Sequence, residues 1–182
     1  MKQELRYILL DTPLEDFARA VGELGWERRP TPCVEGARAA WLPDDGGEVL
    51  WIEPVSASTP VLRLMGSDLE QLEEDLAFLA GARGPSDIIN LMAEASDRTD
   101  LLAILPLAGL LARGPYDQAL GEAIAHALNA GDREMQAAVS DGLRWSQWPE
   151  LAEPILQSLQ MSPISQEIRE RLESIYARLI IN

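Results

Sequence analysis

The chain has 182 residues, enough for one large domain or two small ones, and its 47% hydrophobic and 25% charged residues are ordinary for a soluble globular protein. Its charge is unusual, because 30 acidic residues face 15 basic ones and the excess is spread over both halves. Such a field argues against nucleic-acid and membrane-surface binding and favours a basic protein partner. The longest apolar run, residues 101–112, is shorter than the ~20 residues that span a bilayer. Because the N-terminal apolar run is also too short for a signal peptide, we expect a cytoplasmic protein.

Residues 1–81 show the pattern of a small α+β domain. A strand is expected at Tyr7–Leu10, followed at Asp11-Thr12-Pro13 by the start of a helix. The apolar side chains of this helix recur every three or four residues, and Gly25 is placed to end it in a left-handed conformation. The pattern leaves open whether Trp26–Arg29 adds another strand.

A hairpin is the clearest feature of this first part. The strand-like runs Ala37–Leu42 and Glu48–Glu53 flank residues 43–47, whose glycines and aspartates suit a tight turn. A third run, Val61–Met65, precedes a capping box that begins at Ser67. The following helix is expected to bury its leucines, Leu69, Leu72, Leu76 and Leu79. Together these elements predict a small antiparallel sheet with two helices on one face.

The second part, residues 85–182, contains an internal repeat without any strand pattern. Arg83-Gly84-Pro85-Ser86-Asp87 recurs thirty residues later as Arg113-Gly114-Pro115-Tyr116-Asp117, and Pro149 follows Pro115 by thirty-four residues. Each Gly-Pro pair is predicted to end one helix and begin the next. Six helices are expected, near residues 85–95, 99–112, 116–131, 132–145, 149–159 and 165–180. Pro106 is expected to kink the second helix, and Pro154 to interrupt the fifth.

This second part resembles HEAT and armadillo-type helical repeats. The resemblance covers residues 85–180 and rests on short, alanine-rich paired helices with a period of 30 to 34 residues. Residues 132–145, in which Asp-Arg-Glu precedes an alanine-rich stripe, are similar to the second helix of a HEAT unit. The resemblance implies an all-α stack of about three helical hairpins that presents one concave face to a protein partner. Residues 1–80 resemble no family.

No catalytic, cofactor-binding or metal-binding residues are predicted. The sequence has no phosphate-binding glycine loop, no nucleophile elbow and no paired Cys or His with metal-ligand spacing. The single histidine, His126, lies off the apolar stripe of its helix, and Cys33 has no histidine nearby. The pair Asp97 and Asp100 is expected to cap the second helix of the repeat part.

Two sets of residues are candidates for partner binding, since tryptophan and arginine are enriched among binding hot spots. The candidates are Arg83, Arg113, Tyr116, Arg144, Trp145 and Trp148. For each set a structural role stays open. The tryptophans can fill the junction between repeats, and the arginines can satisfy carbonyl groups at helix C-termini.

The sequence therefore favours a non-enzymatic interaction module, an adaptor or regulatory scaffold that binds a protein partner through its helical face. The alternative is an acidic immunity-type protein that neutralises a basic toxin or nuclease. A remote third reading is an enzyme whose site lies at the domain junction. The apolar C-terminal residues 179–181 also leave homodimerisation open.

Overall fold

The structure is a computed structural model that describes residues 3–10, 12–43, 47–53, 59–66, 69–77, 81–130, 132–161 and 164–181. The chain divides into two compact units, residues 1–84 and residues 85–182. The first unit has a six-stranded antiparallel sheet with two helices, and the second is a stack of paired helices. The predicted α+β fold class followed by an all-α stack is confirmed.

The sheet of the first unit has the strand order β2-β3-β4-β5-β1-β6, and every pairing is antiparallel. The strands are β1 (Gln3–Leu9), β2 (Glu27–Arg29), β3 (Ala37–Leu42), β4 (Glu48–Ile52), β5 (Val61–Gly66) and β6 (Ala82–Arg83). The predicted hairpin is the β3–β4 pair. The strand expected at Tyr7 begins at Gln3 instead, because its charged first half pairs with the end of β5.

The two edge strands are short. A further strand, which the sequence left open at Trp26–Arg29, is present as β2. β6 lies within the segment 81–84 that separates the predicted domains. β6 pairs with β1, with Leu9 opposite Ala82. Strands of two or three residues without a buried face leave no alternating pattern in a sequence.

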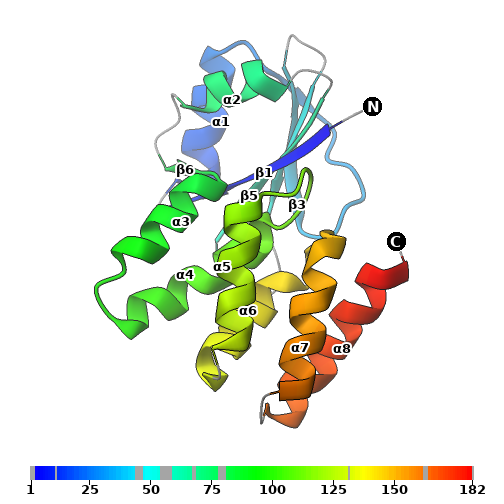
Figure 1. The fold of residues 1–182 in the computed structure, drawn as a ribbon. Coiled ribbons are helices and arrows are strands. Elements are labelled where there is room, and N and C mark those ends of the chain that lie inside the picture. Colours follow the sequence, from blue (N-terminus) through cyan, green and yellow to red (C-terminus); the bar gives the residue numbers. More distant parts are fainter. Residues whose placement is uncertain are drawn as a thin grey trace. The chain divides into compact units, whose positions relative to one another are not determined.

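Both helices of the first unit, α1 (Leu14–Glu23) and α2 (Leu69–Ala77), pack on the same face of the sheet (Figure 1). At the centre of this core the ring of Phe17 lies 5.1 Å from that of Trp41 and 5.3 Å from that of Trp51. All three side chains are buried, because Trp41 of β3 and Trp51 of β4 point to the face of the sheet that Phe17 of α1 covers. The two tryptophans of the hairpin are therefore part of the core of the first unit.

Gly25 follows α1 with a φ of +82°, the left-handed conformation predicted for it. Leu69, Leu72 and Leu76 of α2 are buried, as predicted. Asp11, residues 44–46 of the hairpin turn, Ser67 of the capping box and Leu79 lie outside the described residues.

The second unit consists of three helix pairs. The helices are α3 (Pro85–Glu94), α4 (Arg98–Leu111), α5 (Gln118–Asn129), α6 (Arg133–Leu143), α7 (Ala152–Met161) and α8 (Gln166–Ile181), with a 3₁₀ turn, η1 (Pro149–Leu151), before α7. Each helix contacts its partner in the pair and also the helix two places along the chain. The helices therefore form two layers, the α3–α5–α7 layer and the α4–α6–α8 layer (Figure 1).

The closest helix contact in this unit joins α4 and α6. A Cβ atom built on Gly109 would lie 2.5 Å from the carbonyl carbon of Gly142, and one built on Gly142 would overlap the carbonyl oxygen of Pro106. The two glycines thus allow the two backbones to touch. α4 continues through Pro106 to Leu111.

Three predicted helix boundaries are wrong. The segment before Pro85 is β6, so Gly84 ends no helix there. α5 begins at Gln118 rather than at Pro115, because Asp117 caps it by accepting a hydrogen bond from the Leu120 amide at 2.8 Å. α7 is not interrupted at Pro154, because a proline in the first turn lacks only an N–H that has no partner within the helix.

Other helix starts agree with the sequence. Pro85 is the first residue of α3, and Pro149 is the first residue of η1. Asp97 caps α4 as predicted, by accepting a hydrogen bond from the Asp100 amide at 3.0 Å. Asp132 caps α6 through the Glu134 and Met135 amides.

Candidate functional site

Trp148 lies inside the helical unit, in the segment that follows α6, and it packs against the segment that follows α4. Its side chain is 2% exposed, and its Nε1 donates a hydrogen bond to the Gly114 carbonyl at 3.1 Å. Its ring meets that of Tyr116 edge-on, with centroids 5.0 Å apart. Trp148 thus fills the junction between two helix pairs. Tyr116, which is 40% exposed, is the member of this aromatic pair that reaches the surface.

The remaining predicted residues are distributed over both units. Arg83 is exposed on β6 of the first unit, and its Nη1 lies 3.5 Å from the Ala82 carbonyl oxygen. Arg113 follows α4, and Trp145 follows α6; both are half-buried. Arg144 is the C-cap residue of α6 and borders a groove. Of the six predicted residues, Arg144 is the one that lies in this groove.

The groove lies along α8, beside the C-terminal end of α6, and has a volume of about 470 Å³. It is lined by charged, polar and apolar side chains: Arg144, Glu167, Glu170, Arg171, Ser174, Ile175 and Arg178. Three guanidinium groups therefore lie in one groove of a unit in which acidic residues outnumber basic ones by 14 to 7.

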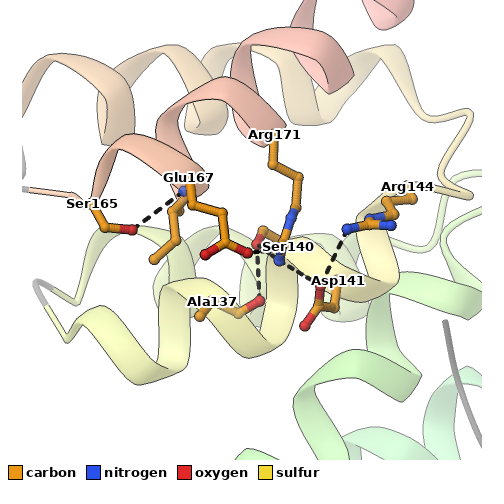
Figure 2. A network of polar contacts seen from close by, with 8 residues as sticks. Ala137, Ser140, Asp141, Arg144, Ser165, Glu167 and Arg171 are labelled. Carbon is orange, nitrogen blue, oxygen red and sulfur yellow. Dashed lines mark hydrogen bonds and ion pairs between the residues drawn. The ribbon is translucent and has the colours of Figure 1, made fainter.

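Arg171 ties the two walls of the groove together (Figure 2). Its guanidinium donates to Ser140 Oγ at 3.1 Å and forms an ion pair with Asp141, both on α6. It also pairs with Glu167, one turn earlier on its own helix, at 3.0 Å. Because the Arg171 side chain is 15% exposed and has three partners, its role is to fix α8 against α6.

Arg178 closes the other end of the groove by capping α6. Its guanidinium donates to the main-chain carbonyls of Leu143 at 3.1 Å and Ser146 at 3.2 Å, and also to that of Arg144. The carbonyls at this helix end are thus satisfied by an arginine, but by one from α8 rather than by the neighbouring Arg144. Burial lowers the pKa of the Arg178 guanidinium, which stays protonated at neutral pH.

Arg144 differs from these two arginines. Its side chain is 49% exposed, and its Nη2 lies 3.8 Å from the Asp141 carboxylate, the same group that pairs with Arg171. A guanidinium has five N–H donors, so most of the bonding capacity of Arg144 faces the groove and solvent.

Sequence reasoning missed Arg171 and Arg178, although a signal was present. Arg171, Ser174 and Arg178 recur at helical spacing, next to the buried stripe of Ile168, Leu172, Ile175 and Leu179. That spacing places the three polar residues on one side of the helix, at the border of its buried face. What the spacing does not reveal is that α6 is the neighbouring helix.

Charge is sorted between the two layers. All seven arginines of the second unit lie on α4, α6 and α8 or at their ends: Arg98, Arg113, Arg133, Arg144, Arg169, Arg171 and Arg178. The helices of the α3–α5–α7 layer and η1 contain no arginine or lysine, and they carry five exposed carboxylates: Asp87, Glu94, Glu122, Glu150 and Glu153. One layer is therefore purely anionic on its surface.

Tyr116 lies close to carboxylates of this anionic layer. Partial burial raises the pKa of its hydroxyl, and the nearby carboxylates of Glu150, Glu122 and Asp117 raise it further. An exposed aromatic ring beside several carboxylates suits the ammonium or guanidinium group of a basic protein.

His126 and Cys33 are both exposed. Within the described ranges, no three His, Cys, Asp or Glu side chains cluster in a way that would hold a metal ion. None of the helices among those residues is both long and apolar enough to cross a bilayer.

No family model, curated protein or solved structure matches this chain. Inferences about its function therefore rest on its own residues.

Proposed function

We propose that the chain is a non-enzymatic, cytoplasmic protein-interaction module, and that a protein partner binds in the groove between α6 and α8. The observation that carries this proposal is Arg144, a half-exposed guanidinium with spare donors at the rim of a preformed groove of about 470 Å³. Arginine is among the residue types most enriched at binding hot spots. We also propose that the second unit is related to HEAT-type repeats, and the packing of its helix pairs in two layers supports this.

The walls of the groove suit a partner because they are already ordered. Arg171 and Arg178 hold α8 to α6 through hydrogen bonds and ion pairs, so little ordering is left to occur on binding. A preorganised surface loses less conformational entropy when a partner docks.

Affinity capture with a groove-filling variant tests this proposal. The tagged chain is incubated with lysate of the cells that produce it, in parallel with Ser174→Trp and Ser86→Trp. Ser174 lines the groove, whereas Ser86 is an exposed residue of α3, so the two variants carry the same substitution at different surfaces. We expect the wild type and Ser86→Trp to retain the same partner and Ser174→Trp to lose it. Equal retention by all three proteins would contradict the proposal.

A second candidate function is inhibition of a basic protein such as a toxin or nuclease. The observation that favours it is the anionic α3–α5–α7 layer with the exposed ring of Tyr116. Such a surface attracts a cationic active site and accelerates the encounter.

Charge neutralisation separates this second candidate from the first. The variant Glu122→Gln/Glu150→Gln/Glu153→Gln removes three charges from this layer. A control variant, Glu15→Gln/Glu23→Gln/Glu35→Gln, removes three exposed charges from the first unit. Inhibition predicts that the first triple variant weakens capture of a basic protein and that the control does so less. If the two variants behave alike, only net charge matters and the layer is not a binding surface.

A further inference from the structure

The chemistry of the groove indicates which kind of segment it accepts, and this step rests on the proposed function. Arg171 and Arg178 each donate three hydrogen bonds within the walls, so Arg144 is the cation with the most donors left to meet a ligand. Its nearest carboxylate, Asp141, is shared with Arg171 and lies 3.8 Å away. A carboxylate from a partner would receive two parallel hydrogen bonds from the guanidinium, a geometry that a lone ammonium group does not provide.

Carboxylates lie on the other side of the same network. Figure 2 shows Glu167 and Arg144 on opposite sides of the Ser140–Asp141–Arg171 contacts. Glu167 is 82% exposed and gives only Oε1 to Arg171, and Glu170 accepts a hydrogen bond from Gln166 through Oε1. One carboxylate oxygen of each residue thus has no partner among the described residues, and both residues line the groove.

A purely acidic ligand does not suit this groove, because the unit as a whole is negative and Glu167 and Glu170 would repel it. A purely basic ligand would place a positive charge next to Arg144, which would repel it. Opposite charges at the two ends of the groove favour a ligand that also carries both.

We propose that the groove between α6 and α8 binds a mixed-charge segment of a partner protein, with an aspartate or glutamate on Arg144 and an arginine or lysine against Glu167 and Glu170. The charge order of the groove then fixes the direction in which the segment lies. Ile175 and Ser174 between the charged ends contact the uncharged part of the segment.

Peptide pools test the proposal on the full chain. Four immobilised pools of heptapeptides carry fixed charges at the second and sixth positions, and all other positions are randomised among uncharged residues. The fixed pairs are glutamate then arginine, arginine then glutamate, two glutamates, and two arginines. We expect one of the two mixed-charge pools to retain the chain best, and better than the pool with the reverse order. This preferred mixed-charge pool serves for the variants.

Variants locate the binding on the groove. Arg144→Gln should lower retention on the mixed-charge pool by about tenfold, as for the loss of a charge-assisted hydrogen-bonded pair. Arg133→Gln removes the same charge from an exposed position of the same helix outside the groove and should have little effect. Glu167→Gln/Glu170→Gln should lower retention by a few-fold, since both carboxylates are exposed. Circular dichroism spectra and thermal melts of all variants are recorded first, so that only folded proteins are compared.

Several results would overturn the proposal: best retention on a single-charge pool, equal retention of wild type and Arg144→Gln on the mixed pool, or no retention on any pool. The proposed function fails differently, through a partner that Ser174→Trp still captures. A partner lost by Ser174→Trp but kept by Arg144→Gln would leave the groove as the binding surface and remove only its charge specificity.

Discussion

Trp148 shows how single residues hold the helical unit together. Its buried ring packs on Tyr116, and its indole N–H satisfies the Gly114 carbonyl, which lies in a turn with a φ of +80°. The ring of Tyr116 in turn lies against Gly121 of α5, where a Cβ atom would overlap the tyrosine hydroxyl. One aromatic pair thus joins two inter-helix segments to α5.

We predict that Trp148→Ala lowers the free energy of unfolding by about 3–5 kcal/mol, because it leaves a large cavity and an unsatisfied carbonyl. Trp148→Phe keeps most of the apolar contact and should cost roughly half as much. Urea denaturation followed by far-ultraviolet circular dichroism measures both values. A loss below about 1 kcal/mol for the alanine variant would show that the ring does not support the junction.

Asp132 links stability to pH. The hydrogen bond from the Met135 amide holds the pKa of its carboxyl group below the usual value, against the opposing effect of desolvation and with further help from the Glu134 amide and from Arg98. Since the folded pKa is the lower one, the stabilising contribution is complete above the unfolded pKa of 3.8 and is lost as the pH falls through the folded value.

We therefore predict that Asp132→Asn, which keeps the cap but does not titrate, is less stable than the wild type at pH 6, and that this difference shrinks as the pH falls below about 4. Urea midpoints measured from pH 6 to pH 2.5 give the comparison. A difference that stays constant over this range would contradict the assigned linkage.

At the scale of elements, the contact between α4 and α6 determines how the helix pairs stack. Glycine is a poor helix former, yet Gly109 and Gly142 lie within helices because a side chain at either position would meet the opposite backbone. At these two positions close packing contributes more to the stability of the fold than a residue with higher helix propensity would.

Gly142→Ala should therefore destabilise the chain by about 2 kcal/mol or more, since overpacking outweighs the gain in helix propensity. Gly22→Ala provides the matched control, because a Cβ atom at this position of α1 meets nothing within 4 Å. That variant should stabilise the chain by about 0.5–1 kcal/mol. Thermal unfolding compares the two variants, and equal stabilisation by both would mean that the backbones of α4 and α6 do not touch.

Much of the element pattern could be predicted from the sequence, and the failures have physical causes. Helices with a regular apolar stripe, such as α5 and α6, were predicted because burial repeats at helical spacing. Their exact starts depend on which residue caps the helix, so α5 begins directly after its cap Asp117 and not at Pro115. β6 was missed because two residues that pair with β1 carry no periodic signal.

For the molecule as a whole, the acidic composition was evident from the sequence but its arrangement was not. The sorting of the second unit's seven arginines to the α4–α6–α8 layer depends on which helices share a layer, and this does not follow from the sequence. The groove likewise depends on contacts between residues about thirty positions apart, such as Ser140 with Arg171. Arg144 was predicted as a binding residue from its type and position, whereas the groove beside it could be found only from the structure.

The distribution of charge predicts how the affinity for a partner depends on salt concentration. A partner held in the mixed-charge groove should lose affinity only modestly between about 50 and 300 mM salt, because only a few ion pairs hold it there. An inhibitor complex on the anionic layer should weaken far more over the same range. Titration of the captured partner at several salt concentrations distinguishes the two, and a steep salt dependence would favour the inhibitor function.

Site-specific photo-crosslinking in living cells tests the groove most directly. A photoreactive amino acid replaces Ser174 in the groove or, in a matched strain, Ser86 on α3. Binding in the groove predicts a crosslinked partner protein from position 174, a much weaker product when Arg144→Gln is added, and no such product from position 86. A partner that crosslinks from position 86 and not from position 174 would contradict the assignment of the α6–α8 groove as the binding surface.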